Sequence, residues 1–310
     1  MSTRLGFMFA GQGAQFPGMG RDLPAVSPAA AAVFEQADSL LGRSLSALCF
    51  GDDAAALTAS ANCQPAIFTV SLACAAAFRE RTGLAPAVCG GLSLGELTAL
   101  AAAGAYDFAT GLRLVARRGE LMDQACAASQ GAMAAVIGGE PAVIERICGE
   151  TGIDVANYNC PGQIVVSGPA ERMDAASERL AAAGARSVVR LNVAGAFHSR
   201  LMQPAADAFA PVLEATAITV PACPVAQNVA GALVTDSAEL RRNLARQVTG
   251  SVHWETCVRA MLATGIQALV EFGPGKVLAG FMRRIDRSFP VCSIQGAEDL
   301  AAAEKLLESL

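Results

Sequence analysis

Short apolar segments alternate along this chain with longer segments in which apolar residues recur at helical spacing. Residues 6–9 and 88–90 are short and apolar and lie beside glycines, which predicts two buried strands. The periodic segments around them predict helices at residues 29–41, 66–81, 94–103 and 108–127. Strands that alternate with helices in this way are typical of α/β proteins built on a parallel sheet.

The stretch from residue 129 to residue 195 has a different pattern. It predicts strands at residues 133–137, 155–157, 164–167 and 187–191, with helices at residues 141–150 and 170–183. This β-α-β-β-α-β order is that of a ferredoxin-like unit. We therefore expect a large catalytic domain formed by residues 1–128 and 196–310, into which a small ferredoxin-like subdomain at residues 129–195 is inserted. The last part of the large domain is predicted to hold helices at residues 200–214, 238–247 and 254–263, a strand at 268–271 and a helix from 277.

Composition narrows the class of protein. The chain has 310 residues, 53% of them hydrophobic, which predicts an extensive core. Charges, glycines or prolines interrupt each alanine-rich stretch before the roughly 18 residues that a membrane span needs, and the apolar residues 5–9 are too few for a signal peptide, so a buried first strand is expected there. A net charge of −5 argues against a broad nucleic-acid surface.

The cysteines and histidines point to the compartment and argue against a metal. Ten cysteines are scattered through apolar runs without a C-x-x-C pair, as in reduced, cytoplasmic proteins. Two histidines and no cluster of histidine, cysteine and carboxylate offer little from which to build a zinc site, so no metal is assigned.

A G-x-S-x-G pattern at residues 91–95 carries the first chemical signal. It lies between a predicted strand and a predicted helix, the context of a nucleophile elbow in an α/β-hydrolase-like domain. In such a turn Ser93 is exposed as the nucleophile, Gly91 and Gly95 let the backbone bend, and the N–H of Leu94 faces the developing oxyanion. The alternative is an ordinary turn capped by Ser93, and the strand before it and helix after it favour the elbow.

A nucleophilic serine needs a general base, and the chain has only two histidines. His198 opens a new segment after residues 195–197, where irregular backbone can hold a side chain over a cleft. His253 precedes Trp254 at the start of a predicted helix, a position typical of a packing or capping residue. This favours His198 as the base.

Five motifs in a fixed order then carry a family resemblance. They are F-A-G-Q-G-A-Q at residues 9–15, G-L-S-L-G-E at 91–96, R-G-E-L-M at 118–122, G-A-F-H-S at 195–199 and F-G-P-G-K-V-L at 272–278. Over nearly its whole length the chain resembles the malonyl-CoA:acyl carrier protein transacylases of fatty acid or polyketide synthesis. Many members have histidine before the serine where this chain has Leu92, a difference that concerns that side chain and leaves the nucleophile in place.

The resemblance implies an acyltransferase that works by a ping-pong mechanism. Ser93 would take a malonyl group from malonyl-CoA, with His198 as its base, and pass it to the phosphopantetheine thiol of an acyl carrier protein. The resemblance adds the backbone N–H of Gln12 to that of Leu94 in the oxyanion hole, and it gives Gln247 the carbonyl that orients the histidine. We expect a monomer that needs no cofactor of its own.

The resemblance also assigns the substrate pocket. Arg118 would hold the free carboxylate of the malonyl group, because a planar guanidinium can donate two parallel hydrogen bonds to a carboxylate. Met122 comes from the same motif. Gln64 matches a pocket position, although glutamine before proline is equally typical of a helix start. Phe197, beside the base, is associated in related acyltransferases with malonyl substrates, and otherwise it is a buried aromatic.

The sequence leaves open two rival functions and the roles of two groups of positively charged residues. The rivals are a serine hydrolase or editing acyl hydrolase on the same scaffold, which would have no use for Arg118, and a non-catalytic carrier-docking subunit, which would not need the serine and histidine. Arg283, Arg284 and Arg287 are either a docking patch for an acidic carrier protein or one solvated helix face. Residues 273–276 lack phosphate-loop spacing and predict a strand-to-helix turn, with Lys276 as a candidate for a CoA or phosphopantetheine phosphate.

Overall fold

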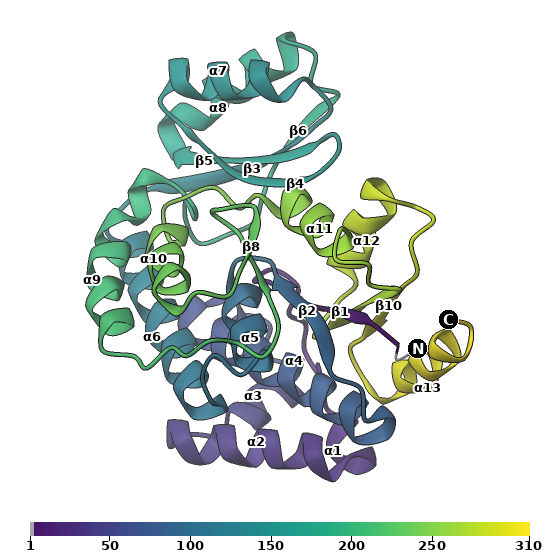
Figure 1. Ribbon diagram of the computed structural model, residues 1–310. Coiled ribbons are helices and arrows are strands. Elements are labelled where there is room, and N and C mark those ends of the chain that lie inside the picture. The colour runs from purple at the N-terminus through teal and green to yellow at the C-terminus, as the bar shows by residue number, and fades with distance from the viewer. Residues whose placement is uncertain (1–2) are drawn as a thin grey trace.

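The computed structural model describes residues 3–310, and residues 1 and 2, which the sequence assigns to the large domain, lie outside the described residues. A lower domain contains a mostly parallel sheet with helices on both faces, and an upper domain contains a separate antiparallel sheet (Figure 1). The predicted α/β class, with a parallel core and a second, smaller sheet, is confirmed.

The sheet of the large domain has the strand order β10-β9-β1-β2-β7-β8. Its strands are β1 (Leu5–Phe9), β2 (Pro86–Gly91), β7 (Val225–Gln227), β8 (Ala232–Val234), β9 (Ala268–Phe272) and β10 (Val291–Ile294). All pairs are parallel except that of β7 with β8. Every residue of β1 and β9 is buried, as expected for central strands covered on both faces. Strands β7, β8 and β10 were not predicted, because three or four residues give too short a pattern.

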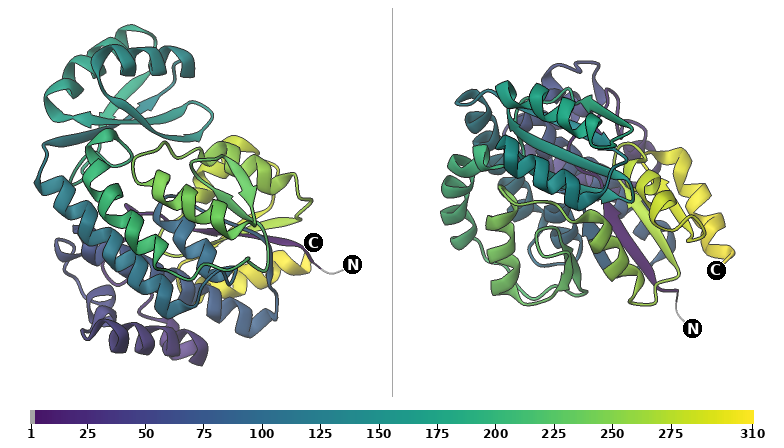
Figure 2. Two further views of the ribbon diagram at one scale, coloured as in Figure 1. Left: turned by 60° about the vertical axis from the view of Figure 1, so that its left-hand side comes forward. Right: turned by 90° about the horizontal axis from the view of Figure 1, so that it is seen from above.

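Helices of the large domain cover both faces of this sheet (Figure 2). They are α1 (Leu23–Val26), α2 (Pro28–Leu41), α3 (Leu45–Phe50), α4 (Ser60–Thr82), α5 (Leu94–Ala102), α6 (Phe108–Ala127), α9 (Gln203–Glu214), α10 (Ser237–Gln247), α11 (Trp254–Leu262), α12 (Val277–Ile285) and α13 (Ala297–Glu308). Short 3-10 turns lie at Ala56–Thr58 and Arg200–Met202, so the helix predicted from residue 200 begins in fact at residue 203.

Helix α4 begins six residues before the predicted start at residue 66. Pro65 suggested a boundary, but the helix continues through it, and the Ala61 carbonyl, which Pro65 cannot bond, accepts a hydrogen bond from Arg43 Nη2 at 3.3 Å. The carboxylate of Asp123 accepts the N–H groups of Ser60 and Ala61, at 2.9 and 2.8 Å, and so caps the helix. By length and composition α4 could cross a membrane, but 78% of that stretch is buried in the core of this domain.

The small domain has the predicted element order. Its elements are β3 (Gly131–Ile137), α7 (Pro141–Thr151), β4 (Asp154–Cys160), β5 (Gln163–Pro169), α8 (Ala170–Ala182) and β6 (Ser187–Arg190). The antiparallel strand order β4-β5-β3-β6 is that of a ferredoxin-like sheet, and α7 and α8 pack on its outer face over a separate apolar core (Figure 1).

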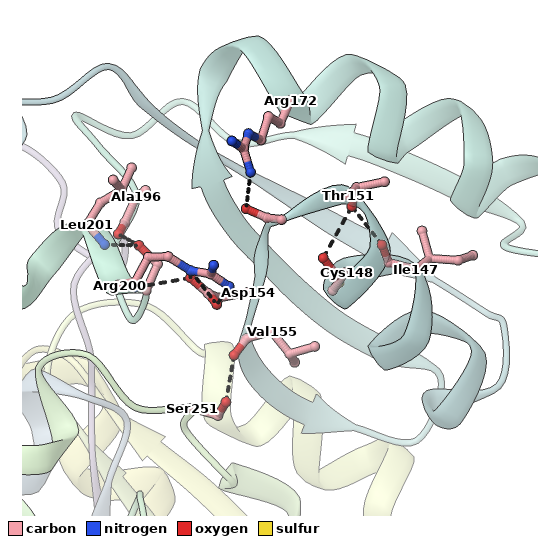
Figure 3. Close-up of polar contacts among 12 residues, drawn as sticks. Ile147, Cys148, Thr151, Asp154, Val155, Arg172, Ala196, Arg200, Leu201 and Ser251 are labelled. Atoms are coloured by element: carbon pink, nitrogen blue, oxygen red, sulfur yellow. Dashed lines mark hydrogen bonds and ion pairs between the residues drawn. The ribbon is translucent and has the colours of Figure 1, made fainter.

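Edge strand β4 fixes the small domain to the large one. Its backbone pairs with Val252, which donates its N–H to Ala156 O and accepts that of Tyr158, both at 2.8 Å. Two neighbouring contacts in Figure 3 add to this pairing: Ser251 Oγ donates to Val155 O at 2.6 Å, and Arg200 forms an ion pair with Asp154. Since residue 252 follows closely on the end of α10, this joint also positions the large-domain backbone around residue 250.

Candidate active site

The predicted elbow lies at the carboxyl end of β2, where the chain turns sharply into α5. A Cβ on Gly91 would lie 2.1 Å from the backbone of Gly95, and a Cβ on Gly95 would lie 2.1 Å from Phe9 O. Only glycine fits at either position. Ser93 has φ 53° and ψ −101°, and within residues 3–310 Ser93 and His198 are the only non-glycine residues with positive φ. Strain of this kind is found where the surroundings fix a functional residue.

Ser93 and His198 are in direct contact. His198 Nε2 lies 2.7 Å from Ser93 Oγ, while Nδ1 lies 2.9 Å from Gln247 O and 3.1 Å from Gly250 O. Because Nδ1 faces two carbonyl acceptors, it carries the proton, and Nε2 offers its lone pair to the serine. Burial, together with the nearby Arg118 cation, lowers the pKa of His198 to about 4. The imidazole is therefore neutral at physiological pH and able to accept a proton.

Arg118 lies directly behind the serine, with a side chain only 1% exposed. Its Nη2 donates to Ser93 Oγ at 3.1 Å and to Gln247 Oε1 at 2.9 Å, and its Nη1 donates to Gln64 Oε1 at 2.9 Å. Burial lowers the pKa of Arg118 to about 10. Among the described residues, no carboxylate hydrogen-bonds to this guanidinium and its Nε has no partner. The site thus holds a desolvated cation, with a donor to spare, beside the nucleophilic oxygen.

Two backbone amides beside the serine are free to bind an oxyanion. Leu94 is the first residue of α5, where N–H groups have no helical acceptor, and Gln12 lies in the loop after β1. That loop packs against the elbow, because a Cβ on Gly11 would lie 2.5 Å from Leu92 O. In residues 3–310 neither amide has a protein acceptor. The side chain of Gln12 is held by Ser60 Oγ at 3.1 Å and by Gln64 Nε2 at 3.2 Å.

A cavity of about 200 Å³ opens in front of the serine, between the two domains. Its lining includes Gln12, Ser93, Met122, Phe197 and His198 from the large domain, Met133, Asn157, Asn159 and Val165 from the small domain, and residues 191–194 from the segment that joins them. Gln64, Arg118 and Gln247 are buried behind this lining, and Arg118 reaches the cavity through its contact with Ser93 Oγ. Gln64, which is part of α4 rather than a residue before it, also donates to Met122 Sδ at 3.3 Å.

Comparison with known proteins identifies the family. Residues 6–303 match the acyl transferase domain family. This chain belongs to that family. It is 39% identical to the malonyl CoA-acyl carrier protein transacylase of Bacillus subtilis, over 99% of this chain and 98% of that protein. The resemblance inferred from the five motifs is confirmed.

Solved structures agree with the fold as well. The acyl transferase superposes with a TM-score of 0.95 on the malonyl CoA-acyl carrier protein transacylase of Coxiella burnetii, at 34% identity, over 99% of this chain and 98% of that one. It superposes with a TM-score of 0.94 on a malonyl-transacylase solved in complex with its type II PKS acyl-carrier protein, also at 34% identity, over 98% of this chain and 99% of that one.

Sequence reasoning missed two buried residues at the elbow of this acyl transferase. Asn228, directly after β7, accepts the Ser93 N–H through Oδ1 at 2.6 Å and donates through Nδ2 to Gly91 O at 2.8 Å. Glu96, in the first turn of α5, accepts the Asn228 N–H through Oε2 at 2.6 Å, and burial raises the pKa of its carboxyl to about 7. Asn228 gave no signal because the strand before it is only three residues long.

Asn157 and Asn159 of the acyl transferase were also missed, although they alternate along β4 and line the cavity. Two amides at a spacing of two residues lie on the same face of a strand, and this was a readable signal. Both side chains are more than nine-tenths buried.

Other residues that carried sequence hypotheses lie away from the serine. The ring of His253 stacks on Tyr158 with centroids 4.9 Å apart and does not line the cavity. Lys276 forms an ion pair with Asp299 at 3.3 Å. Arg283, Arg284 and Arg287 are exposed. Over residues 3–310 no group of three or more metal-ligating side chains is close enough to hold a metal ion.

Proposed function

We propose that this acyl transferase moves a malonyl group from malonyl-CoA to the phosphopantetheine thiol of an acyl carrier protein. The relatives favour transfer over hydrolysis, because those compared above are malonyl transacylases along their whole length. The observation that carries the substrate is the buried Arg118 guanidinium, 3.1 Å from Ser93 Oγ and without a carboxylate partner among the described residues. A malonyl ester on that oxygen supplies the missing carboxylate.

In the first half-reaction His198 Nε2 takes the proton of Ser93, and Oγ attacks the thioester carbonyl of malonyl-CoA. Negative charge develops on the carbonyl oxygen, where the amides of Leu94 and Gln12 stabilise it. The imidazolium is stabilised in turn by the carbonyls of Gln247 and Gly250, which stand where a serine hydrolase places a carboxylate. His198 then gives the proton to the departing CoA thiolate. CoA is released, and the malonyl group remains on Ser93 as an ester.

In the second half-reaction the thiol of the phosphopantetheine arm enters the same cavity and gives its proton to His198. Its sulfur attacks the ester carbonyl, the oxyanion forms between the same two amides, and Ser93 leaves with the proton from His198. Throughout, Arg118 holds the malonyl carboxylate. Water must compete poorly with the thiol for this ester, because hydrolysis would otherwise release the malonyl group.

For the carrier protein we propose docking on a basic patch made of Arg283, Arg284 and Arg287. The patch flanks the cavity-lining strand: α12 packs on β4, and a Cβ on Gly162, in the turn after β4, would lie 3.0 Å from Arg284 Nη2. Changing all three arginines to glutamate should raise the KM for the carrier protein about tenfold or more and leave serine acylation by malonyl-CoA unchanged. Arg113→Glu, on the exposed side of α6, is the control. A carrier KM unchanged within about twofold would place docking elsewhere.

The proposal includes a monomer in the cytoplasm, with no metal or cofactor besides the arm that the carrier brings. All ten cysteines are free, which suits a reducing compartment. Fatty acid and polyketide carriers bear the same arm, so the site itself serves either pathway.

Arg118→Ala tests the substrate assignment. Without the cation a malonyl carboxylate would be desolvated alone, at a cost of about 2–5 kcal/mol, so kcat/KM for malonyl-CoA should fall by about 30-fold or more. Acetyl-CoA has no carboxylate, and its kcat/KM should hold or rise. Arg117→Ala, on the exposed face of the same helix, is the matched control. A malonyl-to-acetyl ratio that Arg118→Ala leaves unchanged would refute the assignment.

A further inference from the structure

The backbone of Ser93 lies in a conformation that its own sequence does not favour. At φ 53° a non-glycine residue costs about 1–3 kcal/mol, so neighbouring groups must hold it there. Its N–H lies in a buried turn ahead of α5, where no helical carbonyl can accept it. Its Oγ does not cap the helix, since it is directed at His198 and Arg118. Bonds within the elbow, such as that from the Gly95 N–H to Leu92 O at 2.9 Å, leave the Ser93 N–H without an acceptor, so groups from another part of the chain must help to hold this turn.

Asn228 supplies them. Its planar amide accepts the N–H of Ser93 at one end and donates to the carbonyl of Gly91 at the other, at 2.6 and 2.8 Å, so it spans the turn on both sides of Leu92. The side chain is fully buried and has no contact with the cavity. With the Ser93 N–H occupied in this way, the Leu94 N–H is the elbow amide that remains for the oxyanion.

Glu96 fixes Asn228 from the other side. Its Oε2 accepts the Asn228 N–H at 2.6 Å, which ties the end of β7 to the first turn of α5. Like Asn228, it is fully buried and does not line the cavity. The Glu96 carboxylate also attracts the Arg118 guanidinium. It therefore interacts both with Asn228, which binds the Ser93 backbone, and with Arg118, which binds Ser93 Oγ.

We propose that Asn228 and Glu96 are positioning residues that hold Ser93 Oγ in reach of His198 during both half-reactions. The proposal rests on the proposed acyl transfer, since both half-reactions use the same oxygen. It predicts a loss in kcat with little change in KM, because neither residue touches the cavity where the thioester binds. For Asn228 it also predicts an equal loss for malonyl and acetyl groups, because Asn228 bonds to the backbone of the elbow and not to Arg118.

The test measures serine acylation by rapid quench and intact mass, with malonyl-CoA and acetyl-CoA, on Asn228→Ala, Glu96→Ala and Glu96→Gln. A displaced nucleophile should slow acylation at saturation by about 10²-fold in Asn228→Ala, with KM unchanged within about twofold. Glu96→Gln, which keeps an acceptor for the Asn228 N–H, should recover most of the rate that Glu96→Ala loses. If Asn228→Ala does not fold, Asn228→Asp, which keeps the acceptor for Ser93 but not the donor to Gly91, takes its place, with an intermediate loss expected.

Glu271→Ala is the matched control. This glutamate, in strand β9, is as fully buried as Glu96 and also accepts backbone N–H groups, from Leu278 and Ala279, but it has no bond to the elbow and does not line the cavity. It should lower the unfolding midpoint and leave the acylation rate of folded protein within about threefold. The positioning role is overturned if Asn228→Ala behaves like this control, or if its loss falls on KM. Failure of the wild-type protein to acylate with malonyl-CoA would instead overturn the proposed function.

Discussion

Two strand-to-helix turns at the same edge of the large sheet invite comparison, the elbow between β2 and α5 and the turn between β9 and α12. Both contain two glycines, at residues 91 and 95 and at residues 273 and 275. In the second turn the positive φ angles fall on the glycines, 113° at Gly273 and 78° at Gly275. In the elbow the positive φ falls on Ser93, where a side chain makes it costly.

The two turns also differ in whether the N–H groups at the start of the following helix have an acceptor. At α12 the Glu271 carboxylate accepts the N–H groups of Leu278 and Ala279, at 2.9 and 3.0 Å, so the protein itself fills the anion position. The two amides are therefore not free for a phosphate, and a phosphate contact by Lys276 itself stays a prediction. At α5 the Leu94 amide has no acceptor among the described residues, and the nearby Glu96 is turned to Asn228 instead. The turn at α12 is closed by its own carboxylate, whereas the elbow has a strained residue and an amide without an acceptor among the described residues, as the proposed oxyanion hole requires.

The largest effect should come from removing the strained side chain. Ser93→Ala should abolish the malonyl-enzyme adduct, because no other described nucleophile lies within reach of His198 and the free amides. Intact-mass measurement after mixing with malonyl-CoA checks this, with wild-type protein as the control. An adduct that persists on Ser93→Ala would place the nucleophile outside the elbow and remove the basis of the comparison.

The next effect concerns the base. His198→Ala should slow acylation by about 10²–10⁴-fold, the usual contribution of a positioned general base, and leave the fold intact. His253→Ala removes a half-buried ring that stacks on Tyr158, away from the cavity, and should change acylation much less. Acylation rates of the two variants at saturating malonyl-CoA decide the matter, and the reverse ranking would show that the assigned base is wrong.

The pH dependence follows from the lowered pKa of His198. The base works as neutral imidazole, so acylation should stay level from about pH 8 to about pH 5 and fall only as pH approaches 4. Because the unfolded chain protonates this histidine near its ordinary 6.5, its contribution to stability is present above pH 6.5 and is lost as pH falls from 6.5 to about 4. The measurement is kcat/KM against pH, and a midpoint near 6.5 would contradict a desolvated base.

Glu96 is the control for that profile, since its carboxyl pKa is raised to about 7 by burial. If a step near pH 7 is present in the wild-type profile and absent from that of Glu96→Gln, it belongs to Glu96. The limb near pH 4 should be present in both proteins.

The sequence predicted what depends on local pattern. Long periodic helices, the alternation in the small domain, and an elbow marked by two glycines can all be read from neighbours along the chain. Missed elements such as β7, β10, α1 and α3 are only three to six residues long, whereas α13 was missed although its twelve residues offered a readable pattern. The start of α4 was placed too late because Arg43 and Asp123 compensate for Pro65 from elsewhere.

In the site, too, the reacting residues with a local sequence pattern were predicted, and those that depend on distant contacts were not. Ser93 and His198 stand out because an elbow is a local motif and histidines are scarce here, and the structure brings the two together at 2.7 Å. Asn228 acts on a serine 135 residues away in the chain, through contacts that only the packing of β7 against β2 creates. A buried asparagine after a three-residue strand has no local pattern that predicts such a role.

The smallest effect should come from the second turn. Gly275→Ala places a side chain at φ 78°, but its Cβ would meet only ordinary contacts, the nearest 3.6 Å away. The cost is then conformational alone, about 1–2 kcal/mol, which should lower the unfolding midpoint by a few degrees. Acylation should be unchanged, because no residue of this turn lines the cavity in front of the serine. Gly95→Ala is the contrasting variant: its Cβ would lie 2.1 Å from Phe9 O, so the elbow must shift and acylation should fall even in folded protein. Equal acylation by the two variants would mean that the elbow tolerates displacement, and that its strain does not serve to position the serine.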